Sequence, residues 1–199
     1  MKRDPSGDSL VTVAILAGGR AERLGGIDKG LHALDGKPLI ETLLARVREQ
    51  HRCEVMIVAN RNIEGYRQYA STISDRVAGF AGPLAGIAAA LEACTTPWLA
   101  MLPVDCPAPP PDLIPRLLAG AIVQRTSMAV AHDGQRRQPL FAICSRDLAS
   151  DAGRAAADGD GVWRWQDRHG AVEIDFADRR AHFDNLNSAV DFDRYESRL

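Results

Sequence analysis

The stretch that decides the fold is Val11-Thr-Val-Ala-Ile-Leu-Ala-Gly-Gly19. Its first seven residues form a continuous, largely β-branched apolar run, which is typical of a strand buried on both faces of a parallel sheet. The two glycines end this run and open a loop. The stretch therefore predicts an α/β protein whose first strand leads directly into a glycine-rich loop.

Helix and strand patterns alternate after this loop. Apolar residues recur at helical spacing from Leu39 to Val47, and strands are expected at 54–59 and 98–102 with a helix at 84–93 between them. This order of strand, helix, strand, helix and strand predicts a parallel sheet with right-handed crossovers.

The second half of the chain departs from this alternation. The prolines of 104–112 exclude a sheet interior, so Asp105 is expected in the loop that leaves a strand, and Asp112 is expected to cap the helix that follows. Two short strands, 128–131 and 139–143, predict an antiparallel excursion. Further expected elements are a mostly helical segment at 153–169, an edge strand at 171–176 and a polar helix at 188–198.

Length and composition favour one soluble globular domain. The chain has 199 residues, of which 46% are hydrophobic, and we expect a frayed tail at 1–9 followed by a single domain at 10–199. With 24 basic and 26 acidic residues, the net charge of −2 predicts neither a nucleic-acid nor a membrane partner. The apolar run from Val11 to Ala17 is too short to span a bilayer.

The four cysteines are widely scattered and form no CxxC pair. This spacing matches neither a zinc site nor a dense disulfide framework, so we expect reduced thiols and a cytoplasmic protein. The five histidines have no metal-ligand spacing, and no GxSxG motif marks a serine nucleophile.

The segment from Leu16 to Gly30 combines repeated glycines with the basic residues Arg20, Arg23 and Lys29. Glycines let main-chain amides approach phosphate oxygens, and the basic side chains supply compensating charge, so a polyphosphate ligand is expected. The spacing fits neither the dinucleotide fingerprint nor the Walker loop. The competing interpretation is a tight connection between a strand and a helix.

Asp105 follows a predicted parallel strand, at the edge where open α/β sheets bind ligands. A carboxylate there can hold a hard cation such as Mg²⁺, which keeps several waters and needs few protein ligands. The competing interpretation is a turn or cap residue.

These motifs resemble a known family. Leu16-Ala-Gly-Gly19, Arg23, Gly25-Gly26 and Asp28-Lys29 are similar to the signature loop of the nucleotidyltransferases that include sugar-nucleotide pyrophosphorylases. Within them, the chain resembles the molybdenum cofactor guanylyltransferase family. The resemblance runs from about residue 11 to the end and includes Gly82-Pro-Leu-Ala-Gly86, Asp105 before a proline, Gln138-Pro139 and Asn185-Leu-Asn187.

The resemblance implies a Rossmann-like three-layer nucleotidyltransferase fold with a mostly parallel central sheet and an antiparallel excursion. It also implies site residues. Lys29, Asp105 and Arg23 would be catalytic, with Asp105 also holding Mg²⁺ as the cofactor. GTP would be bound by Leu16, Ala17, Gly18, Gly19, Lys29, Asn60, Asp75, Gly82 and Asp105.

Some of these assignments keep an alternative. Family members can have an asparagine where this chain has Val58, so the contribution of Asn60 to base recognition stays open. Asp75 is equally readable as a solvated loop charge, and 82–86 as the ordinary start of a helix.

Two pairs of polar residues are expected to bind the second substrate. Arg136 and Arg137 suit a phosphate, whereas Asn185 and Asn187 suit the edges of a pterin. The alternatives are a solvated arginine pair and an asparagine turn. Trp163 and Trp165 are expected in the core or at a subunit contact, without a catalytic role.

The resemblance implies transfer of GMP from GTP to the terminal phosphate of molybdenum-molybdopterin. One alternative is the same chemistry with CTP or with another phosphorylated acceptor, such as phospholactate or a sugar phosphate. The other is a non-catalytic nucleotide-binding regulator. We expect a monomer that makes transient contact with the enzymes that accept the finished cofactor.

Overall fold

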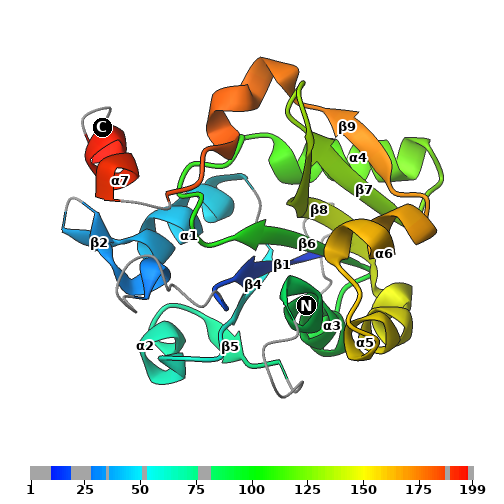
Figure 1. Cartoon of the computed structure of the whole chain (residues 1–199), viewed down its shortest axis with the longest axis horizontal. Helices are drawn as coiled ribbons and strands as arrows, with labels where there is room; N and C mark the ends of the chain where they lie inside the picture. Colours follow the sequence, from blue (N-terminus) through cyan, green and yellow to red (C-terminus); the bar gives the residue numbers. More distant parts are fainter. Residues whose placement is uncertain are drawn as a thin grey trace, which may run out of the picture.

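The computed structural model of the chain describes residues 10–18, 28–34, 36–50, 53–75, 82–186 and 189–196. Their centre is a seven-stranded sheet with the order β5-β4-β1-β6-β8-β7-β9 (Figure 1). The strands are β1 (Val11–Leu16), β4 (Glu54–Val58), β5 (Ser71–Ile73), β6 (Trp98–Pro103), β7 (Met128–His132), β8 (Arg137–Ser145) and β9 (Val172–Asp175). The expected tail at 1–9 lies outside the described residues.

One strand of this sheet is reversed. β8 runs antiparallel to both of its neighbours, β6 and β7, whereas the other neighbouring strands are parallel. The expected parallel sheet with an antiparallel excursion is therefore confirmed. The ends of the sheet are β5, which has three residues, and β9, whose Glu173 and Asp175 are exposed.

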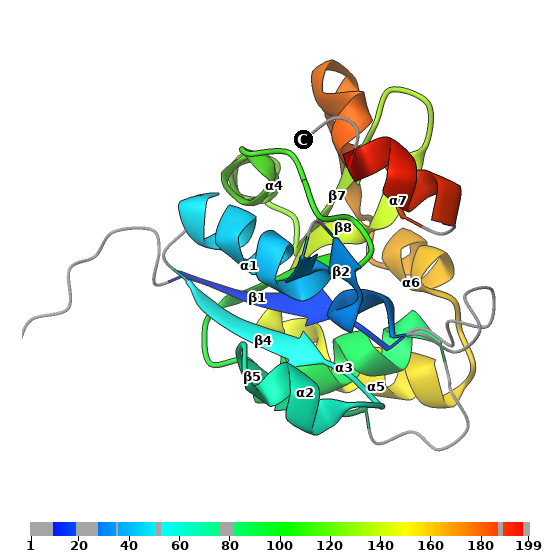
Figure 2. The ribbon, with the colours of Figure 1, turned by 90° about the vertical axis from the view of Figure 1, so that its left-hand side faces the viewer.

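Helices cover both faces of the sheet. They are α1 (Leu39–Gln50), α2 (Ile63–Arg67), α3 (Pro83–Ala93), α4 (Leu113–Val123), α5 (Ala149–Ala157), α6 (Val162–Arg168) and α7 (Ala189–Glu196), with short 3-10 segments η3 (Lys29–Leu31), η4 (Arg146–Leu148) and η5 (Ala177–Phe183). Figure 2 shows α1 and α4 on one side of the sheet and α3 and α5 on the other. β2 (Ala33–Leu34) and β3 (Lys37–Pro38) form a separate small hairpin.

Alternating strand residues fill two cores. Val13 and Ile15 of β1 pack with α1 and α4, whereas Ala14 packs with α3, α5 and α6. Because both faces are covered, β1 has apolar side chains in both directions, which explains its continuous β-branched run. The predicted strands and helices of the first half are confirmed, with ends that differ by at most three residues.

The structure adds detail to two expectations for the second half. The mostly helical segment at 153–169 is confirmed and contains the end of α5 and all of α6, which are separated where Gly159 adopts a positive φ of 76°. Asp112 does precede α4, but its side chain makes no capping hydrogen bond. Its φ of −113° and ψ of 15° depart from the extended cap conformation, and its carboxylate lies 3.6 Å from Arg116 Nη1 instead.

The four cysteines are free thiols, as expected, and all except Cys53 are buried. None of the helices in the described ranges combines the length and the apolar character that crossing a membrane would require.

Candidate functional site

Three parallel strands end side by side and deliver the predicted residues to one edge of the sheet. Leu16, at the end of β1, is in register with Val58 of β4 and with Pro103 of β6. The N–H of Ala17 donates to the Val58 carbonyl at 2.8 Å, and the N–H of Val104 donates to the Leu16 carbonyl at 3.0 Å. The chain therefore leaves the three strands together, at the edge where open α/β sheets bind ligands.

Lys29 and Asp105 meet at this edge. Lys29 Nζ lies 3.3 Å from Asp105 Oδ2, although the two residues are 76 positions apart in sequence. The two side chains are 19% and 20% exposed, so the pair is accessible while partly shielded from water. A cation and an anion held in this way can bind the phosphates of a ligand and a metal ion that accompanies them.

Asn60 and Asp75 form a second pair of predicted residues. Asn60 Nδ2 donates to Asp75 Oδ2 at 2.6 Å, and the Asp75 backbone N–H donates to Asn60 Oδ1 at 3.1 Å. A methyl group on Gly18 would lie 3.9 Å from Asn60 Nδ2, so the end of β1 borders this pair. Asp75 is thus a partly buried loop residue that is paired with Asn60, and its role in binding a nucleotide stays a prediction.

One backbone N–H group at the end of β1 already has a hydrogen-bond partner. Because the Ala17 N–H is already bonded to Val58, a ligand would contact Ala17 through its carbonyl or its side chain.

Gly82 lies at the start of α3 with a φ of 78°, a conformation that favours glycine, and Pro83 occupies the first turn.

Three predicted site residues fall outside the described residues: Gly19, Arg23 and Asn187. Their roles stay predictions from sequence. Asn185 is described and exposed, and the N–H of the neighbouring Leu186 donates to the Asp105 carbonyl at 2.8 Å. This hydrogen bond ties the asparagine segment to the loop that carries Asp105.

Sequence reasoning missed a cluster around Asp28, the residue before Lys29. The Asp28 carboxylate accepts hydrogen bonds from the Gly30 N–H, from the Tyr66 hydroxyl and from Asn62 Nδ2. We call these four residues the Asp28 cluster. Tyr66 and Asn62 belong to a short segment without a clear periodic pattern, and the only signal in the sequence was the place of Asp28 in the loop motif.

The two predicted acceptor arginines have different environments. Arg137 Nε donates to Glu173 Oε1 at 2.9 Å, its Nη1 donates to Asp167, and its guanidinium lies 4.7 Å from the centre of the Trp163 ring. Arg137 is only 11% exposed, whereas Arg136 is 75% exposed. Arg136 is therefore the more accessible of the two arginines, and Arg137 would first have to leave its ion pairs before it could bind a ligand.

The two tryptophans also differ. Trp165 is fully buried, and its Nε1 donates to Asp151 Oδ2 at 3.1 Å, which confirms its expected place in the core. Trp163 is 49% exposed beside Arg137.

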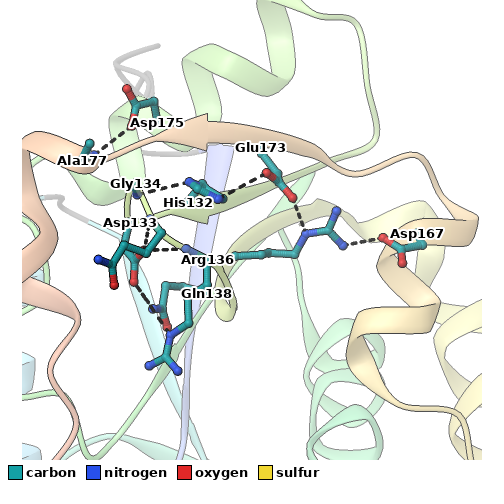
Figure 3. A network of polar contacts seen from close by, with 11 residues as sticks. His132, Asp133, Gly134, Arg136, Gln138, Asp167, Glu173, Asp175 and Ala177 are labelled. Atoms are coloured by element: carbon teal, nitrogen blue, oxygen red, sulfur yellow. Dashed lines mark hydrogen bonds and ion pairs between the residues drawn. The ribbon is translucent and has the colours of Figure 1, made fainter.

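Asp133 holds the turn before β8. Its Oδ1 accepts from the N–H groups of Gln135 and Arg136 at 2.7 and 2.8 Å, and its Oδ2 accepts from Gln138 Nε2 at 2.6 Å (Figure 3). Burial alone would raise the pKa of the Asp133 carboxyl, but these hydrogen bonds outweigh burial and hold the pKa below 3.8. The charged carboxylate thus fixes the turn that presents Arg136.

This depressed pKa predicts a pH dependence of stability. A carboxyl whose folded pKa lies below its unfolded value stabilises the fold above pH 3.8, and this contribution is lost as the pH falls through the folded value. The Tm difference between the parent and Asp133→Asn should be constant above about pH 5 and should shrink below pH 3.8, as measured by thermal unfolding across pH. A difference that is unchanged down to about pH 2 would contradict the role of the charged form.

Known proteins are similar to this chain in sequence and in fold. The family model for the MobA-like NTP transferase domain matches residues 13–172. A molybdenum cofactor guanylyltransferase of Mannheimia succiniciproducens is 40% identical over 183 residues, which cover 91% of this chain and 96% of that protein. Another, from Burkholderia ambifaria strain MC40-6, is 43% identical over 189 residues, covering 89% and 91%.

A solved structure adds agreement in fold. The crystal structure of molybdopterin-guanine dinucleotide biosynthesis protein A from Archaeoglobus fulgidus matches 94% of this chain and 97% of its own, with a TM-score of 0.77 and 24% identity. From the family match and the identities over most of its length, the chain belongs to the MobA-like NTP transferase family and, within it, to the molybdenum cofactor guanylyltransferases.

Proposed function

We propose that this chain transfers GMP from GTP to the terminal phosphate of molybdenum-molybdopterin. The products are molybdopterin guanine dinucleotide and pyrophosphate. The observation that carries this proposal is the 3.3 Å approach of Lys29 to Asp105 at the ligand edge of the sheet, in a chain whose relatives are named molybdenum cofactor guanylyltransferases. A charge pair at this place suits a magnesium-bound triphosphate.

The residues at the site fit a magnesium ion. No group of three or more His, Cys, Asp or Glu side chains in the described part of the chain is placed to hold a metal. Asp105 offers a hard oxygen ligand, and phosphate oxygens and waters complete the coordination that Mg²⁺ prefers. When bound, Mg²⁺ would neutralise negative charge that builds up on the phosphates during transfer.

Lys29 and the end of β1 would hold the triphosphate for in-line attack. A terminal phosphate oxygen of the acceptor forms a bond to the α-phosphorus of GTP, and the bond from that phosphorus to the bridging oxygen of pyrophosphate breaks. The attacking phosphate is already anionic, so the step needs no general base. The contribution of the protein is positioning and charge compensation by Lys29.

The Asn60 and Asp75 pair favours guanine as the base. A carboxylate accepts two parallel N–H donors, and the Watson–Crick edge of guanine supplies two, N1–H and the amino group. Asp75 Oδ2 receives one hydrogen bond from Asn60, which leaves further lone pairs on the carboxylate. Cytosine offers one amino donor on the same edge, so this site would bind it less strongly.

The acceptor would bind between the Asp105 loop and the start of β8. The Leu186 N–H donates to the Asp105 carbonyl, which holds the neighbouring Asn185 close to the Asp105 loop. Asn187 follows Leu186 in sequence. Arg136 is the exposed cation for a phosphate, and Arg137 fixes the start of β8 through Glu173 and Asp167.

The proposed function is tested by incubating the protein with Mg²⁺, molybdenum-loaded molybdopterin and GTP or CTP labelled at the α-phosphate. Labelled dinucleotide and pyrophosphate from GTP alone is the expected result. Selective use of CTP would overturn the choice of base. Nucleotide binding without transfer would point to another acceptor or to a regulator.

A further inference from the structure

The Asp28 cluster connects two parts of the chain that lie far apart in sequence, 28–30 and 62–66. Asp28 Oδ1 accepts from the Gly30 N–H at 3.2 Å and from the Tyr66 hydroxyl, while Asp28 Oδ2 accepts from Asn62 Nδ2 at 3.0 Å. Both carboxylate oxygens are therefore engaged. Because Lys29 lies between Asp28 and Gly30, these hydrogen bonds fix the backbone from which Lys29 extends.

Tyr66 is the member of this cluster with a large buried side chain. The residue is fully buried, and its ring packs in the core between the sheet and α1. Burial, followed by the hydrogen bond to Asp28, raises the pKa of the Tyr66 hydroxyl well above its ordinary value. The phenol thus stays protonated at physiological pH and remains a hydrogen-bond donor.

Gly30 shows how closely this segment is packed. A methyl group on Gly30 would lie 2.3 Å from the Tyr66 hydroxyl oxygen and 2.9 Å from Val104 Cγ2. Val104 is the residue before Asp105. The Tyr66 ring, the Gly30 backbone and the chain leading to Asp105 are therefore in direct contact, so a displacement of one displaces the others.

We propose that Tyr66 is a positioning residue that holds Lys29 beside Asp105 through its hydrogen bond to Asp28. Asn62 donates to the other oxygen of the Asp28 carboxylate and so helps to hold Asp28 in place. The backbone of Asn62 is left-handed, with a φ of 50°, and it leads the chain into α2. The consequence for phosphate binding rests on the proposed function, in which Lys29 contacts the triphosphate. Tyr66 itself contacts neither substrate.

A purely structural role for Tyr66 is the competing explanation, and Tyr66→Phe separates the two. This change keeps the ring that fills the core and removes only the hydroxyl. The matched control is Tyr69→Phe, because Tyr69 follows α2 closely and its hydroxyl makes no hydrogen bond with the described residues.

The kinetic test compares Tyr66→Phe with the parent in the GMP transfer assay. We expect kcat/KM for GTP to fall about tenfold, because a charge-assisted hydrogen bond that orders Lys29 is lost. Tyr69→Phe should match the parent. Binding of a non-hydrolysable GTP analogue with Mg²⁺ is measured by calorimetry in Tyr66→Phe, Lys29→Met and the double variant.

The double variant decides whether Tyr66 acts through Lys29. If it does, Tyr66→Phe weakens analogue binding in the parent and has no further effect once Lys29 is methionine. A structural role predicts that the two losses add, and additive losses would overturn the proposal.

A last measurement is independent of turnover. Hydrogen exchange of the Gly30 amide should be faster in Tyr66→Phe than in the parent, because Asp28 no longer holds that N–H in place. If the parent fails to transfer GMP, the proposed function is wrong, and analogue binding and Gly30 exchange still decide the role of Tyr66. Unchanged exchange and unchanged binding in Tyr66→Phe would refute that role.

Discussion

Replacing Asp105 with asparagine is expected to lower kcat for GMP transfer by about a thousandfold, because the change removes the charge that would hold Mg²⁺ against the phosphates. Asparagine keeps the size of the side chain. The carbonyl of residue 105 can still accept from the Leu186 N–H, so the loop should keep its shape. Steady-state kinetics at saturating GTP, with Mg²⁺ varied, measures the effect.

Folding should change little in Asp105→Asn. The carboxylate is 20% exposed, and a partly exposed ion pair contributes modestly to stability, so we expect the Tm to move by no more than about 3 °C. The control is Asp112→Asn, which removes a different carboxylate, one that pairs with Arg116. Parental turnover in Asp105→Asn would show that Asp105 holds no catalytic metal.

Gly30→Ala is expected to destabilise the fold by about 2 kcal/mol, because overpacking a filled core costs a few kcal/mol. The added methyl would lie 2.3 Å from the Tyr66 hydroxyl oxygen and 2.9 Å from Val104 Cγ2, so both side chains would have to move. Since Lys29 and Asp105 adjoin these groups, kcat/KM for GTP should fall as well. Denaturant unfolding and the GMP transfer assay measure the two effects.

Gly153→Ala is the matched control, and its effect on the free energy of unfolding should have the opposite sign. Gly153 lies inside α5, and a methyl group there would meet nothing within 4 Å. Alanine favours helix over glycine by up to about 1 kcal/mol, so this variant should be as stable as the parent or more stable. If both variants unfold alike, the close packing at Gly30 has no energetic consequence.

The sequence predicted the central features because they depend on local patterns. The continuous apolar run of β1 identified a buried strand, and the glycines after it identified the ligand loop. The family resemblance assigned Lys29 and Asp105 to one site, and the rule that open α/β sheets bind ligands where parallel strands end placed Asp105 at that edge. Their approach to 3.3 Å agrees with that expectation.

The features that were missed depend on contacts between distant residues. α2 has five residues, including Gly65, and β5 has three, so neither is long enough to show a period. The hydrogen bond from Tyr66 to Asp28 spans 38 positions and leaves no pattern in the sequence.

The different environments of the adjacent residues Arg136 and Arg137 could not be predicted, for another reason. Arg136 lies in the turn and Arg137 begins β8, so their side chains enter different environments although both looked suited to a phosphate. Only the positions of Glu173 and Asp167 show that Arg137 is already paired.

The two ends of the sheet bear on how the protein behaves at high concentration. An unpaired edge strand can template the addition of a strand from another chain, which is a common route to aggregation. Here one edge is the three-residue β5, and the other is β9, which carries exposed carboxylates at Glu173 and Asp175. One edge is short and the other carries acidic side chains, and both features disfavour the growth of the sheet from molecule to molecule.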